Sequence, residues 1–154
     1  MHILPHWTWP GREGEVTPVF VYTNYPTAEL FINGKSYGKQ SKNNSSLKNR
    51  YRLMWMDAVY EPGEVKVVAY NKEGKAVAEK VVRTAGKPHH IELVSNRNEL
   101  TADGKDLAYV TVKVVDKDGN PCLLIIVRLT SLQREPVNIV PLPMANPTNL
   151  EQFH

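Results

Sequence analysis

Apolar and polar residues alternate along most of the first 120 positions with the period of two that is typical of β-strands. The alternation is sharpest in Ala28–Lys39, where Leu30 and Ile32 fall on one face and Phe31 falls on the other. Within this stretch, Asn33-Gly34 predicts a tight hairpin turn, because both residues tolerate a positive φ. The chain is organised around this predicted hairpin, and its flanking segments carry the same pattern.

The same pattern predicts further strands, separated by turns that are rich in Gly, Pro and Asn. These strands are expected at Thr17–Thr23, Tyr51–Val59, Val65–Tyr70, Ala76–Thr84, His90–Val94 and Leu107–Asp116. Turns are expected at 61–64, 71–75, 102–104 and 118–120, and a polar, mobile loop at 41–49. Helical periodicity is absent from the first 120 residues over any useful length, so the predicted fold class is all-β.

A change of pattern divides the chain into two units. Ala85–Pro88 has the composition of a linker, and the β pattern restarts after it. The predicted units are residues 1–86 and 87–154. After Cys122 the alternation stops, and residues 133–149 contain four prolines, which ordinary sandwich strands exclude. We therefore expect one strand near 124–129, an extended tail, and a second unit that is truncated or irregular after about residue 122.

Composition narrows the function classes. The 154 residues include 42% apolar residues, which is enough for a hydrophobic core, and the net charge of +3 is scattered rather than gathered into a basic stripe. No apolar run has the length of a membrane span. We therefore expect neither nucleic acid nor membrane as a partner. Cys122 is the one cysteine, which fits a reducing compartment and equally a secreted bacterial protein that needs no disulfides.

Candidate reactive groups are sparse. The densest acidic group of the first unit has the placement of solvated carboxylates at a strand end and turn; it comprises Asp57, Glu61 and Glu64. The histidines have no metal-ligand spacing; they include His2, His6, His89 and His90. Asp116–Asn120 resembles the start of a calcium loop, but its glycine comes one position early and Val127 stands at the twelfth position. A hairpin turn explains that stretch better, and we expect no catalytic, cofactor or metal site.

Several longer motifs are shared with one family. They are His2–Trp9, Pro18–Thr23, Ala28–Ser36 and Tyr60–Gly63. Together they resemble the region after the catalytic barrel in Bacteroides-type β-galactosidases of glycoside hydrolase family 2, where this region is an immunoglobulin-like β-sandwich. Residues 88–121 are similar to the start of bacterial immunoglobulin-like, invasin-type modules.

The chain departs from the family pattern at residues 123–145, and residues 145–154 resemble it again. A reading-frame disruption between about Cys122 and Met144 would explain this departure, and sequencing the encoding DNA tests that hypothesis. The second module is then incomplete. An incomplete sandwich leaves strand edges unpaired, and this predicts self-association.

The resemblance implies a non-catalytic accessory region that supports the barrel of a glycosidase in carbohydrate degradation. The catalytic carboxylates of the family lie on that barrel, which precedes this segment and is the expected partner. The parent protein is expected in the periplasm or at the cell surface of a bacterium, with its signal outside this sequence. Two alternatives stay open, namely an autonomous carbohydrate-binding module and an adhesive immunoglobulin-like module that binds protein.

The N-terminal aromatics have two interpretations. Residues 1–16 hold Trp7 and Trp9 in a proline-containing, loop-like stretch that must pack on another part of the protein or on something missing from it. Together with Tyr25 they either pack against the barrel or contact sugar, because an aromatic ring with a polar edge suits both roles.

Overall fold

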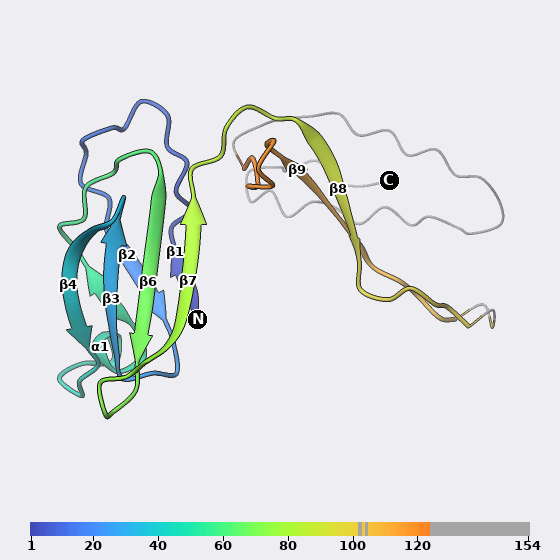
Figure 1. Ribbon diagram of the computed structural model, residues 1–154. Coiled ribbons are helices and arrows are strands. Elements are labelled where there is room, and N and C mark those ends of the chain that lie inside the picture. Colours follow the sequence, from blue (N-terminus) through green and yellow to red (C-terminus); the bar gives the residue numbers. More distant parts are fainter. Residues whose placement is uncertain (102, 104, 124–154) are drawn as a thin grey trace.

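The computed structural model describes residues 1–101, 103 and 105–123, and Figure 1 shows that they are built almost entirely of strands. The predicted all-β class is confirmed. The first 83 residues form two antiparallel sheets that face each other as a sandwich. The first sheet has the order β1-β2-β5, with β1 (His2–Leu4), β2 (Val19–Tyr22) and β5 (Leu53–Trp55). The second has the order β4-β3-β6-β7, with β3 (Thr27–Ile32), β4 (Lys35–Ser41), β6 (Glu64–Tyr70) and β7 (Ala76–Arg83).

The core lies between these sheets and is filled by alternate positions of the strands. In β6, for example, Val65, Val67 and Ala69 are buried while the residues between them are partly exposed. The same arrangement holds in β2 and β3, as expected for antiparallel sheets with one face on the core. The largest enclosed side chains are Trp7, Trp55, Tyr60, Leu30 and Ile32.

The predicted hairpin is confirmed as β3 and β4, joined at Asn33-Gly34. Asn33 has φ 48° and Gly34 has φ 81°, so both occupy the left-handed region that a two-residue hairpin turn of this kind requires. Leu30 and Ile32 are buried and Phe31 lies on the other face, as the alternation predicts.

Two segments differ from their predictions. His2–Leu4, within the stretch predicted to be loop-like, forms strand β1 and pairs with β2. The end of the predicted 41–49 loop, together with Arg50 and Tyr51, forms the short helix α1 (Leu47–Tyr51). The Ser46 side chain caps it by accepting a hydrogen bond from the Asn49 amide at 3.2 Å. The predicted strand over 51–59 is correspondingly reduced to β5, and a turn begins at Met56. A helix of five residues is too short to show a period of 3.6 in the sequence, which is why the pattern missed it.

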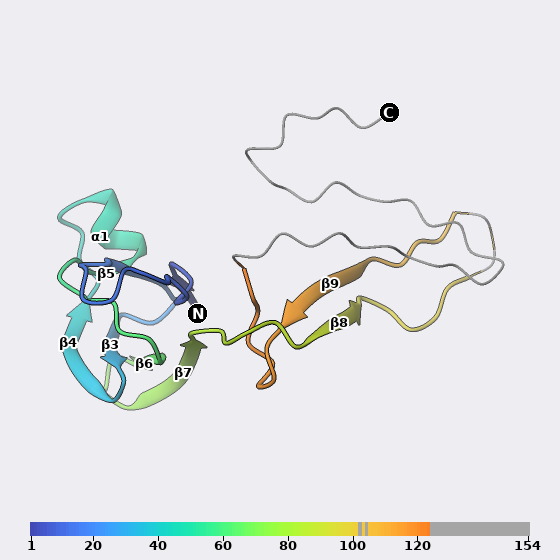
Figure 2. The ribbon, with the colours of Figure 1, turned by 90° about the horizontal axis from the view of Figure 1, so that it is seen from above.

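A further sheet pairs β8 (His90–Ser95) with β9 (Val110–Val115), and Figures 1 and 2 show it beside the sandwich rather than within it. Both strands agree with the predicted segments, and the predicted turn at 118–120 follows β9. Residues 102 and 104 of another predicted turn, the expected strand near 124–129, the tail and the proposed frame disruption lie outside the described residues. In the described part of the chain, no helix has the length and apolar character required to cross a membrane.

Candidate functional site

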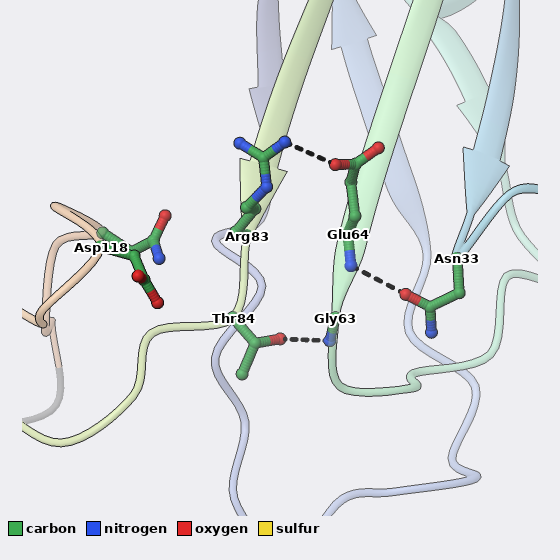
Figure 3. Close-up of a pocket in the computed structure, with 7 residues that line it drawn as sticks. Asn33, Gly63, Glu64, Arg83, Thr84 and Asp118 are labelled. Carbon is green, nitrogen blue, oxygen red and sulfur yellow. Dashed lines mark hydrogen bonds and ion pairs between the residues drawn. The ribbon is translucent and has the colours of Figure 1, made fainter.

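A polar cleft of about 560 Å³ lies where the sandwich meets the turn after β9. It is lined by the β3–β4 turn, the start of β6, the end of β7 and the turn after β9, as Figure 3 shows. The lining residues are Asn33, Gly63, Glu64, Arg83, Thr84, Asp118 and Asn120. We call this region the junction.

The polar groups of the sandwich side of the junction bind one another. Arg83 Nη2 donates to Glu64 Oε2 at 2.6 Å, and the Glu64 amide donates to Asn33 Oδ1 at 2.8 Å. The Gly63 amide donates to Thr84 Oγ1 at 3.0 Å. Because each of these groups has a partner within the site, the arrangement fixes backbone positions and does not present an activated acid, base or nucleophile.

The predicted linker and the residue before it form hydrogen bonds with two different parts of the chain. Thr84 Oγ1 donates to the Trp7 carbonyl at 2.5 Å, and the Ala85 amide donates to Thr8 Oγ1 at 2.9 Å. On the other side, the Gly86 amide donates to Asp116 Oδ2 at 2.7 Å. Residues 84–86 therefore connect the N-terminal segment to the β8–β9 sheet through direct hydrogen bonds.

Asp116 organises the turn after β9. Its side chain is buried, with 2% of the residue exposed, and it accepts hydrogen bonds from the amides of Gly86, Asp118 and Asn120 at 2.7–2.9 Å. The Asn120 side chain also donates to both carboxylate oxygens. The Gly86 amide, followed by the Asn120 side chain, holds the pKa of Asp116 well below its usual range. The stretch 116–120 therefore forms the predicted hairpin turn. N–H groups donate to both carboxylate oxygens of Asp116, which are the atoms that would bind a calcium ion.

Acidification of the protein from pH 7 to pH 4 is expected to leave the Asp116 turn unchanged. The folded pKa of Asp116 is depressed, so its stabilising effect is complete above the ordinary aspartate pKa of about 4 and is lost as the pH falls through the lower folded value. The chemical shift of the Gly86 amide proton, followed by NMR, reports the event. A midpoint near pH 4 would contradict the assignment, and Asp116→Asn should abolish the low-pH transition.

The three acidic residues Asp57, Glu61 and Glu64 lie in different surroundings. Asp57 and Glu61 are exposed, whereas Glu64 pairs with Arg83 in the junction. In the described ranges, no three side chains of His, Cys, Asp or Glu are grouped so that they could hold a metal ion.

The N-terminal segment packs on the sandwich of its own chain. Trp7 is only 1% exposed, its ring packs edge-to-face with that of Tyr60 at a centroid separation of 5.2 Å, and its Nε1 donates to the Glu61 carbonyl at 2.9 Å. Trp9 is half-buried and stacks on His6 at 4.0 Å, with the Arg12 guanidinium 5.5 Å from its ring. Trp7 therefore has no free face for a barrel or a sugar, whereas part of Trp9 is accessible.

Trp9 and Tyr25 lie at opposite ends of the sandwich. β1 and β2 run antiparallel, with His2 opposite Tyr22 and Leu4 opposite Phe20. Trp9 follows the Leu4 end of β1, and Tyr25 follows the Tyr22 end of β2, so the two rings cannot form one platform. A contact of either ring with a barrel or a sugar stays a prediction.

Two family profiles match most of the chain. A domain of unknown function, DUF4982, matches residues 14–78, and the glycoside hydrolase family 2 C-terminal domain 5 matches residues 91–154. The chain corresponds to a C-terminal accessory region of glycoside hydrolase family 2. This accessory region is 46% identical, over 79% of its length, to 14% of beta-galactosidase BoGH2A from Bacteroides ovatus.

Other relatives of the accessory region carry different names. A beta-glycosidase from Bacteroides vulgatus has a solved structure that superposes with a TM-score of 0.69, at 36% identity over 79% of this chain and 15% of that one. A beta-glucuronidase from Formosa agariphila is 28% identical over 80% of this chain and 12% of its own length. The accessory region thus spans about one-seventh or less of each of these glycoside hydrolases.

Sequence reasoning missed the junction. The residues that meet there are far apart in the chain, and the Thr84–Trp7 bond alone spans 77 positions. The one local signal is the Asp-Lys-Asp-Gly-Asn turn at 116–120, whose first aspartate is typical of side chains that accept from the following backbone amides.

Proposed function

We propose that this accessory region is a non-catalytic β-sandwich that supports the catalytic barrel of a parent glycosidase in carbohydrate degradation. The proposal rests on how little of its relatives the chain covers: it resembles glycoside hydrolases over a small C-terminal share of their length. The relatives named beta-galactosidase and beta-glucuronidase act on different sugars by their names, so an accessory region common to them suits a supporting role better than sugar selection.

The described residues support a structural role. Hydrogen bonds at and beside the junction join the N-terminal segment, the sandwich and the turn after β9. Among the described residues, the carboxylates that are not exposed pair with cations or accept hydrogen bonds from amides and hydroxyls. Such pairing suits a structural role, whereas a retaining glycosidase uses two carboxyl groups about 5–5.5 Å apart that flank the bond to be cleaved.

The proposal is tested by deleting the region that corresponds to this chain from the parent polypeptide. We expect a lower midpoint of thermal unfolding for the barrel and a reduced kcat/KM, because the barrel loses packed surface beside its substrate cleft. Unchanged unfolding and unchanged kinetics would contradict a supporting role. Titrating this chain alone with galactosides, followed by tryptophan fluorescence, should give no shift; a saturable shift would favour a carbohydrate-binding module instead.

A further inference from the structure

The two outer faces of the sandwich differ in chemistry, and one of them carries a row of apolar side chains across its strands. On the three-stranded sheet, Leu4, Phe20 and Met54 stand side by side across β1, β2 and β5 and point away from the core. His2, Tyr22 and Arg52 continue this surface, which we call the β1–β2–β5 face. Leu4 is 41% exposed and Tyr22 is 38% exposed, so the face is open in the isolated chain.

The outer face of the four-stranded sheet is charged and internally paired. Glu29 accepts a hydrogen bond from Tyr70 at 3.0 Å and lies 4.0 Å from Lys39. Ammonium groups lie over the aromatic rings of this outer face: Lys39 Nζ is 4.0 Å from the Tyr70 ring, and Lys66 Nζ is 5.2 Å from the Phe31 ring. This face carries paired charges across its strands, whereas the β1–β2–β5 face carries the row of Leu4, Phe20 and Met54 across its strands.

Arg52 gives the β1–β2–β5 face a chemical preference. Its guanidinium carbon lies 4.9 Å from the Phe20 ring, and its Nη1 donates to the Tyr22 hydroxyl at 3.3 Å. Its Nε is buried and, among the described residues, has no hydrogen-bond acceptor. Its own chain encloses the Nε, so another domain can reach Arg52 only through its Nη groups. A carboxylate is the anion that matches the planar fork of a guanidinium best.

We propose that the β1–β2–β5 face docks on the domain that precedes this sequence in the parent polypeptide, and that an acidic side chain of that domain pairs with Arg52. The inference rests on the proposed function and adds the surface that carries it. A domain joined to the start of β1, an edge strand of this sheet, is held beside this face at a high effective concentration. The relatives contain ample additional chain, since this region covers 14–15% of two of them.

Hydroxyl-radical footprinting read by mass spectrometry tests the docking. Met54 and Tyr22 should be labelled in this chain alone and protected several-fold in the parent polypeptide. Tyr70, on the other outer face, should be labelled equally in both. Equal labelling of Met54 and Tyr22 in the two proteins would overturn the proposal. Protection of both residues in this chain alone, dependent on its concentration, would also overturn it, because a second copy would then be the occupant.

Two charge-reversal variants, a test and a control, examine the role of Arg52. In the parent polypeptide, Arg52→Glu should restore the labelling of Met54 and Tyr22, because two carboxylates would then face each other. Lys66→Glu is the matched control, since Lys66 also lies over a phenylalanine ring but on the opposite face. Circular dichroism of both variants in this chain confirms folding. Protection that survives Arg52→Glu would contradict the acidic pairing.

The two proposals can fail separately. Protection of Met54 in the parent together with unchanged stability and kinetics on deletion would keep the docking face and reject the supporting role. A loss of stability on deletion without protection of Met54 would keep the supporting role and reject this face as its contact.

Discussion

Replacing Trp7 with alanine is expected to lower the free energy of unfolding of the sandwich by about 3–5 kcal/mol, the range measured for large buried aromatic side chains. Trp7 is 1% exposed and lies between the two sheets although it belongs to the N-terminal segment. The substitution removes its contact with Tyr60 and leaves the Glu61 carbonyl without its indole donor. It also loosens the segment whose Trp7 carbonyl and Thr8 hydroxyl hold Thr84 and Ala85.

Urea denaturation followed by far-UV circular dichroism measures this loss, because the signal does not depend on the tryptophan that is removed. Trp9→Ala is the matched control two residues away: Trp9 is half-buried and stacks on His6, so its loss should cost less. If Trp9→Ala proved as destabilising as Trp7→Ala, the assignment of Trp7 to the core and Trp9 to the surface would be wrong.

The contrast between these two tryptophans marks the limit of the sequence pattern. Both stand in the same proline-containing stretch without alternation, and the residues alone require only that such rings find a surface. Which surface each ring finds depends on Tyr60 and Glu61, more than fifty positions away. The pattern therefore predicted that the segment packs but could not separate a core residue from a surface residue.

Elements with local causes were predictable. The β3–β4 hairpin follows from Asn33-Gly34, whose positive φ values are a property of those two residues. The buried face of β6 follows from strict alternation. Helix α1 has a local cause as well, the Ser46 cap, but its five residues give too little periodicity to outweigh the polar loop around it.

The candidate docking face shows what alternation alone cannot predict, namely which strands are neighbours. The pattern places Phe20 and Met54 opposite the core residues of their strands, yet it does not tell that β1, β2 and β5 are neighbours. Only this strand order aligns Leu4, Phe20 and Met54 into one apolar row and brings Arg52 over Phe20. The charged outer face of the other sheet supplies the comparison that makes the apolar row informative.

Replacing Gly63 with alanine is expected to destabilise the protein by about 3 kcal/mol, through backbone strain and lost hydrogen bonds together. Gly63 has φ 136°, a conformation that residues with a side chain rarely adopt. An added Cβ would also overlap the carboxamide of Asn33, whose Oδ1 accepts from the Glu64 amide and whose Nδ2 donates to the Pro62 carbonyl.

Gly74→Ala is the control for this prediction, because Gly74 also has a positive φ, 79°, but no atom lies within 4 Å of the position of an added Cβ. That variant should lose about 1 kcal/mol from the left-handed conformation alone. Urea denaturation of the two variants gives the difference, and NMR of the Gly86 amide shows whether the change at Gly63 reaches Asp116 through Thr84 and the linker. Equal losses in the two variants would mean that Asn33 moves aside without cost, and the junction would then be a compliant contact rather than a rigid one.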